Sequence, residues 1–242
     1  MITIGVYDVR RRRGVFCRVS GRGGATPDSM RVLVVARTRM GGDRRCIGAL
    51  SLEKKAQSYR LRMADGSYPS VNSPFQVGEI WEVETTRAGV TLEPPHTEDV
   101  RVLSARRVGV EQGFLATTIL QRVKPWRGSI EHLFDGLVQF TNNGHGYVSR
   151  RTGVPSYSTG FWIPDRQLIL DGTHYYYPMF NTNRWKGLAY VGERPPTRRI
   201  MAGALVRVSL ARWWRPPDSE NAEERCYLQL SDWYDYRPCG GW

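Results

Sequence analysis

The sequence has little of what membrane, secreted or disulfide-bonded proteins need. It contains no run of 18 apolar residues, so we expect no transmembrane helix. Its first residues have neither the apolar stretch nor the small-residue cleavage site of a secretory signal. The four cysteines, at positions 17, 46, 226 and 239, are far apart and form no C-x-x-C pair. We therefore expect a cytoplasmic protein with reduced thiols and no bound metal.

Catalytic and cofactor-binding signatures are equally scarce. No GxxxxGK[ST], strand-linked GxGxxG, HExxH or GxSxG motif occurs. One pattern does suggest an enzyme, because Asp43, Glu53 and Lys55 are residue types with which nucleases hold Mg²⁺ and activate water. Such nucleases place these residues in a helix-flanked α/β core, whereas the surroundings here are poor in helix. We expect a protein without catalysis and without a cofactor, and keep the metal-dependent nuclease as a third interpretation.

Lysine is rare, since 31 of the 35 basic residues are arginine, and the net charge is +12. Between positions 10 and 60, fourteen basic residues stand against three acidic ones, so nearly all of the excess charge lies in the first quarter of the chain. Arginine presents a planar fork to phosphate and stacks on bases, so this distribution permits nucleic-acid recognition. A coding bias towards arginine would produce the same composition.

Glycine, proline and aromatic residues are abundant among the 242 residues, which favours short strands and turns over long helices. Between residues 30 and 110, five stretches have strand-like patterns: 31–37, 46–50, 59–63, 81–85 and 100–103. In the third stretch Tyr59, Leu61 and Met63 alternate with Arg60 and Arg62, which we expect on the solvent face. Five short strands in about 80 residues predict a small antiparallel barrel.

The other regions differ from this pattern. Residues 1–29 combine four consecutive arginines with glycines, and we interpret them as a basic N-terminal arm and linker that either contacts nucleic acid or stays solvated. Residues 111–135 have apolar residues at helical spacing, which predicts a helical connector. Strand patterns return over residues 136–242, where the aromatic clusters Tyr175–Tyr177 and Trp213–Trp214 stand out. Because side chains alternate along a strand, the members of each cluster cannot all pack in the core.

Four stretches resemble the prokaryotic proteins described as dual OB domains. The first, residues 30–53, has a strand, a Gly-Gly turn, the sequence CIGAL and an acidic residue. The others are KGLAYVG at 186–192, AGALVRVSLARWWR at 202–215, and ERCYLQLS at 224–231 followed by Trp233 and Tyr234. The resemblance spans residues 30–234 and implies an all-β fold with two OB-like barrels, at 30–110 and 136–242, joined by the helical connector. It also implies helicase or nuclease partners in prokaryotic conflict systems, and it carries no catalytic residues.

We therefore expect an accessory subunit of a prokaryotic defence-type assembly that binds single-stranded DNA or RNA without catalysis. Arginines would neutralise phosphates, and aromatic rings would stack on unpaired bases. The candidate residues surround the first hairpin and the Trp-Trp cluster: Arg37, Arg39, Arg44, Arg45, Arg60, Arg62, Arg212, Trp213, Trp214 and Arg215. The alternative is a protein-interaction module, in which aromatic residues of the second barrel dock a helicase or nuclease partner and the charge is incidental.

Overall fold

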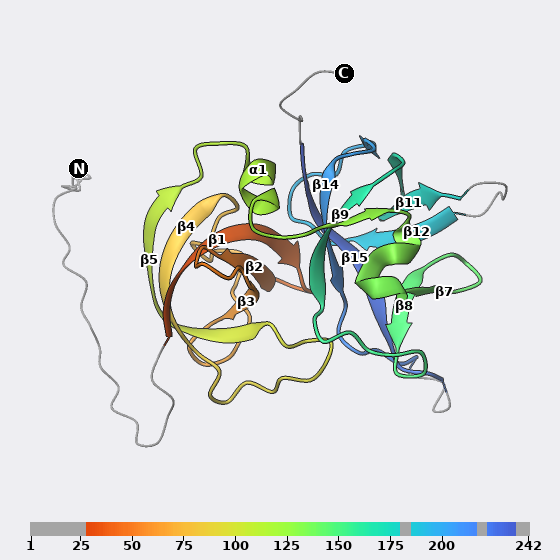
Figure 1. The fold of residues 1–242 in the computed structure, drawn as a ribbon. Coiled ribbons are helices and arrows are strands. Elements are labelled where there is room, and N and C mark those ends of the chain that lie inside the picture. Colours follow the sequence, from red (N-terminus) through yellow and green to blue (C-terminus); the bar gives the residue numbers. More distant parts are fainter. Residues whose placement is uncertain (1–27, 180–184, 217–221, 236–242) are drawn as a thin grey trace, which may run out of the picture.

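Two β-rich units lie side by side in the computed structural model, which describes residues 28–179, 185–216 and 222–235 (Figure 1). Strands dominate both units and the helices are short, so the predicted all-β class is confirmed. Of the predicted basic arm, residues 1–29, only the last two positions are among the described residues. No helix in the described ranges is long and apolar enough to cross a membrane.

The first unit is a closed five-stranded barrel with the order β1-β2-β3-β5-β4. Its strands are β1 (Asp28–Arg39), β2 (Arg45–Ser51), β3 (Ser58–Arg62), β4 (Glu79–Thr86) and β5 (Asp99–Val110). β3 and β5 pair in parallel, and the other neighbours are antiparallel. β1 pairs with β4 through its first half and with β2 through its second half. This is the OB-like barrel that the strand patterns predict.

The second unit is built on one large sheet. Among the described residues its strands are β6 (Trp126–Gly128), β7 (Gln139–Phe140), β8 (Gly146–Ser149), β9 (Thr159–Pro164), β10 (Leu168–Asp171), β11 (His174–Pro178), β12 (Trp185–Tyr190), β13 (Arg199–Ile200), β14 (Leu205–Leu210) and β15 (Arg225–Tyr234). The main path runs β13-β10-β11-β12-β15-β14-β9-β6, and β7 and β8 extend it beside β15.

The core of this sheet repeats the arrangement of the first barrel. β9 and β10 are separated only by residues 165–167, and they pair with β14 and β11, just as the two halves of β1 pair with β4 and β2. β12 and β15 are parallel, as β3 and β5 are. The path β9/β10-β11-β12-β15-β14 is therefore a second OB-type arrangement whose first strand is interrupted after Pro164.

The region between the units contains the two short helical segments that the sequence predicts, with one strand between them. Residues 111–135 contain one short helix, α1 (Leu115–Leu120), most of the 3-10 segment η1 (Ile130–Gly136), and the extended strand β6 between them. β6 pairs in parallel with β9 and so belongs to the second sheet. The two helical segments serve different clusters: Ile119 packs between the units, whereas Ile130 and Leu133 pack inside the second unit.

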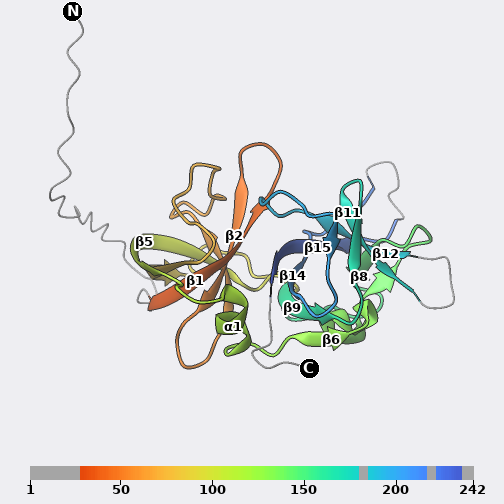
Figure 2. The same ribbon diagram turned by 90° about the horizontal axis from the view of Figure 1, so that it is seen from above.

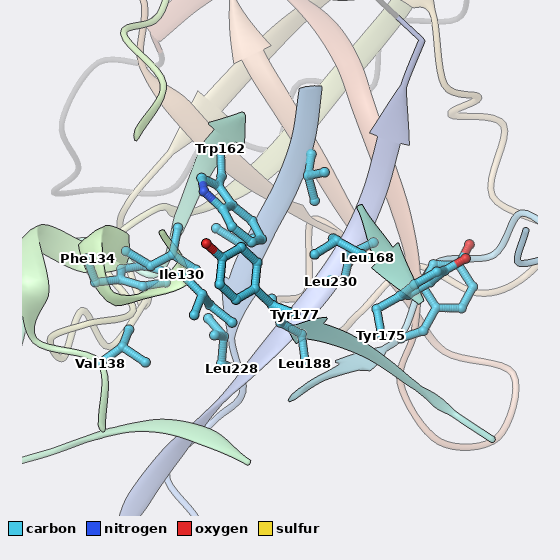
Figure 3. Packing of buried hydrophobic residues seen from close by; sticks show 14 of the residues in the cluster. Ile130, Phe134, Val138, Trp162, Leu168, Tyr175, Tyr177, Leu188, Leu228 and Leu230 are labelled. Atoms are coloured by element: carbon cyan, nitrogen blue, oxygen red, sulfur yellow. The ribbon is translucent and has the colours of Figure 1, made fainter. Parts of the chain in front are cut away.

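Three clusters of buried side chains hold the molecule together. One fills the first barrel, one fills the second unit, and the third lies between β1 and β2 on one side and β9, β14 and β15 on the other. Figure 2 shows these strands facing one another across the junction. In the second unit Trp162, Tyr175 and Tyr177 point into the core (Figure 3), so the middle ring of the triplet, Tyr176, faces outward.

Candidate nucleic-acid interface

Three of the predicted arginines converge on one buried carboxylate. Arg60 Nε lies 2.8 Å from Asp99 Oδ1, and Arg62 Nη2 lies 2.9 Å from Asp99 Oδ2. Arg212, from the second unit, places its Nη2 2.5 Å from the same Oδ2. Burial alone would raise the pKa of Asp99, but Arg60, Arg212 and Arg62 together hold that pKa below its usual value. These arginines therefore neutralise an internal acid and join the two units.

Arg37 and Arg45 have the same role at a second carboxylate. Their Nε atoms lie 2.5 and 2.8 Å from the two carboxylate oxygens of Glu193, which follows β12 in the second unit. Arg37 is buried and also donates to the backbone oxygens of Val71 and Ser73, at 2.9 and 3.0 Å. Five of the eight predicted arginines are thus committed to acids or carbonyls within the chain, most of them across the junction.

The expectation that Arg60 and Arg62 face solvent is wrong. Both point away from the barrel interior, but the outer surface at β3 faces the second unit, and Arg60 is only 6 % exposed. Met63, expected in the core, is 44 % exposed because β3 ends at Arg62. Alternation along a strand identifies the two faces of a sheet, but it does not show which of them meets water.

The covering of the first barrel extends to β2. A Cβ atom at Gly48 would lie 2.5 Å from Nη2 of Arg207, a buried residue of β14, so the two units touch here with no space for a side chain. Leu33, Val35 and Leu50 pack on the same outer surface against the second unit. OB-folds bind oligonucleotides on the face of strands 2 and 3. In the first barrel that face is closed.

The remaining predicted residues lie at or near the surface, in two separate parts of the chain. Arg39 and Arg44 are exposed at the β1–β2 turn, and the Arg39 guanidinium lies 5.7 Å from the ring centroid of Tyr190. Trp213 is half-buried, whereas Trp214 is 48 % exposed, as expected for adjacent residues with opposite directions. Arg215 is exposed beyond them.

The nuclease-like pattern is not assembled either. Asp43 lies in the β1–β2 turn, and the Glu53 carboxylate accepts a hydrogen bond from the backbone N–H of Arg31 at the other end of β2. The seven residues of β2 separate the two acids, which corresponds to roughly 20 Å at the rise of an extended strand. Asp43 and Glu53 therefore cannot hold the same metal ion.

Among the residues that the structure describes, the face of the second unit that corresponds to strands 2 and 3 of an OB-fold is open. Residues in register across neighbouring strands share a face, and one such row runs from β13 to β12: Arg199, Ile169, Tyr176 and Gly187. We call the outer surface formed by β10, β11 and β12 the second-barrel face. It is defined by Ile169, Asp171, His174, Tyr176, Trp185 and Gly187.

A groove of about 900 Å³ lies on this face, between β10–β12 and the turn that joins β7 to β8. Tyr176 lines it and lies flat on Gly187, where a Cβ atom would come within 2.9 Å of the tyrosine ring. Trp185, 44 % exposed, and Phe140 complete its aromatic lining. Asn142 and Asn143 add amide groups that can donate and accept hydrogen bonds. The groove thus combines one exposed ring, two half-buried rings and polar groups.

Histidines continue the aromatic surface next to the groove. His174 lies 6.0 Å from Tyr176 and 4.8 Å from His145, measured between ring centroids. Burial lowers the pKa of His174, and the neighbouring His145 lowers it further. At neutral pH His174 is therefore an uncharged flat ring, which suits stacking rather than charge pairing.

Charge on the second-barrel face is modest. Lys186 lines the groove, with its Nζ 4.1 Å from the Phe140 centroid and 2.5 Å from Oε1 of Glu131. Arg199 is exposed beside Ile169, and Asp171 is an acid on the rim. Sequence reasoning missed this site because it followed the arginine excess, whereas the alternation in 174–177 already marked Tyr176 as opposite in direction to Tyr175 and Tyr177.

Comparison with known proteins agrees with this architecture. No curated protein matches the chain. A family model described as the dual OB-containing domain matches residues 30–233, which includes all of the second unit up to Trp233 and nearly all of the first barrel. Because this match covers most of the chain and the two units have the same strand arrangement, the chain belongs to the dual OB-containing domain family.

Proposed function

We propose that the protein binds single-stranded nucleic acid, and that the second-barrel face carries this activity instead of the first barrel. The observation that supports the proposal most is the contrast between the two OB-type units. The face of strands 2 and 3 is buried in the first, whereas in the second it is open and presents Tyr176 and Trp185. OB-folds bind oligonucleotides on this face and beside the loops at its ends.

Stacking would provide most of the affinity. Every base has a π-face, and each base stacked on an aromatic side chain contributes about 1–3 kcal/mol. Tyr176 is held flat by Gly187, so little conformational freedom is lost when a base packs on it. Arg199 stands in the same row as Tyr176, at a position from which it can contact the backbone phosphate. A duplex keeps its bases stacked on each other and could not use these rings.

The proposal includes both DNA and RNA, and it assigns no catalytic step. The role of accessory subunit in a prokaryotic defence-type assembly, with a helicase or nuclease partner, rests on the family resemblance and is part of the same proposal. A cytoplasmic location would be consistent with that role.

Binding can be measured by fluorescence anisotropy with labelled 15-mers of single-stranded DNA, single-stranded RNA and duplex DNA. We expect the single strands to bind more tightly than the duplex. We also expect a shallow salt dependence, because each phosphate contact on a single strand contributes a slope of only about −0.7 in log affinity against log salt. Equal affinity for the duplex, or no binding to any of the 15-mers at low salt, would contradict the proposal.

A further inference from the structure

A second cavity, of about 640 Å³, lies where the two units meet and shares no lining residue with the groove of the second-barrel face. The first barrel contributes Gln57 and Arg87, and the chain beyond it contributes Lys124, Trp126 and Tyr157. Cavities of this size at a junction between domains are typical of small-molecule sites. Neither the family match nor the proposed strand-binding face accounts for it.

Two aromatic rings on one wall of this cavity are fixed in place. Trp126 lies against the backbone of Gly160, where a Cβ atom would come within 2.3 Å of its Cζ3. Tyr157 stacks beside Trp126, with ring centroids 6.1 Å apart and an angle of 28° between the planes. Trp126 Nε1 donates to Asp135 Oδ1 at 3.1 Å, and the Tyr157 hydroxyl donates to Asp135 Oδ2. One carboxylate thus orients both rings.

The segment that carries this carboxylate is strained. Phe134 and Asp135 have φ values of 50° and 59°, in the left-handed region that residues other than glycine rarely adopt. Such conformations persist where the surrounding contacts enforce them, and they concentrate at ligand sites. Here burial of the Phe134 ring and the two hydrogen bonds to Asp135 enforce the strain, and together they hold Trp126 and Tyr157 at the cavity wall.

The charges around the cavity favour an anion. Its two carboxylates already have donors, since Asp135 accepts from Trp126 and Tyr157, and Glu98 accepts from the backbone N–H groups of Ser158 and Thr159. Its two cations are exposed: among the residues that the structure describes, neither Arg87 nor Lys124 has a carboxylate partner within 4 Å. The two cations can therefore pair with a bound anion, whereas the two carboxylates already accept hydrogen bonds from the protein.

We propose that this junction cavity binds one nucleotide, with the base against Trp126 and Tyr157 and the phosphate between Arg87 and Lys124. The Gln57 amide can hydrogen-bond to the edge of the base. A free mononucleotide and the terminal nucleotide of a strand offer the same chemistry, and the experiment below separates them.

The test uses isothermal titration calorimetry of the full chain with AMP, GMP, CMP, UMP and inorganic phosphate, and with a trinucleotide that carries a 5′-phosphate. The test variant is Arg87→Glu with Lys124→Glu, two surface positions whose reversal leaves the core intact. Lys54→Glu is the matched control, because Lys54 is exposed and does not line the cavity. Tyr176→Ala changes the second-barrel face alone and shows whether a nucleotide binds there instead.

We expect at least one mononucleotide to bind to the wild type. Its affinity should fall tenfold or more in the variant that combines Arg87→Glu with Lys124→Glu. Lys54→Glu and Tyr176→Ala should bind this mononucleotide like the wild type. Both ligands are compared in the Tyr176→Ala variant, so that the second-barrel face contributes little to binding. Tighter binding of the trinucleotide there would identify the end of a strand as the source, and tighter binding of the mononucleotide would identify a free nucleotide.

Three results would overturn the proposal. None of the four mononucleotides binds, inorganic phosphate binds as tightly as they do, or binding is lost only in Tyr176→Ala. The last result would still be consistent with strand binding by the second-barrel face.

Discussion

Asp99 at the start of β5 and Arg212 after β14 belong to different OB-type units, yet Oδ2 of the acid lies 2.5 Å from Nη2 of the guanidinium. Arg60 and Arg62 complete the cluster from β3. A side chain that looks like a nucleic-acid contact in the sequence is therefore part of the structure that joins the units. This relationship moves the candidate binding surface from the first barrel to the second.

Removal of the Asp99 charge should destabilise the whole molecule. In Asp99→Asn, three guanidinium groups around a buried position lose their counter-charge, and breaking a buried ion pair from one side costs about 3–5 kcal/mol. Urea unfolding at pH 7 measures the change in the free energy of unfolding. A loss of less than about 1 kcal/mol would show that the cluster is solvated and does not join the units.

The effect of Asp99→Asn should depend on pH. The pKa of Asp99 is lowered in the folded state, so the folded state binds fewer protons than the unfolded chain, whose Asp titrates near 4. The ionised carboxylate stabilises the fold above that value, and this contribution disappears as the pH falls through the folded pKa. The difference in the free energy of unfolding between wild type and Asp99→Asn should therefore become smaller as the pH is lowered from 6 towards 3.

Asp232 should show the opposite pH dependence. Burial raises its pKa to about 6, although Arg194 lies 3.0 Å away. The folded state then holds a proton that the unfolded chain has released, so the contribution of Asp232 to stability falls as the pH rises from 4 to 7. The side chain in Asp232→Asn cannot ionise, so the stability of this variant relative to the wild type should increase over this pH range. Thermal unfolding at pH 5 and pH 7 measures this, and a constant difference between the two proteins would refute it.

Exposed and paired arginines should respond differently to substitution. Arg39→Ala with Arg44→Ala changes two exposed positions of the β1–β2 turn and should alter the free energy of unfolding by less than about 0.5 kcal/mol for each. Arg60→Ala should cost several times more, because it removes a buried partner of Asp99. Parallel urea titrations compare the two variants, and equal losses would contradict the assignment of Arg60 to the junction.

Period-two patterns and turn residues predict the all-β class and the strands of the first barrel. They also predict that Tyr176 and its two neighbours point to opposite faces of the sheet. The burial of Arg60 does not, because it depends on Asp99 and on Arg212, more than 110 residues further along the chain. β6 was missed because three residues are too few to show a period-two pattern, and their partner is the distant strand β9. Alternation is local, whereas the contact between two units is not.

Binding by the second-barrel face is tested most directly by comparing Tyr176→Ala with Trp214→Ala in the anisotropy titration with a single-stranded 15-mer. Both substitutions remove an aromatic ring that is not fully buried, but only Tyr176 lies on the second-barrel face. We expect Tyr176→Ala to weaken binding by about tenfold or more, the equivalent of one stacked base, and Trp214→Ala to bind like the wild type. Wild-type affinity in Tyr176→Ala together with a loss in Trp214→Ala would contradict this expectation and return the interface to the Trp-Trp cluster.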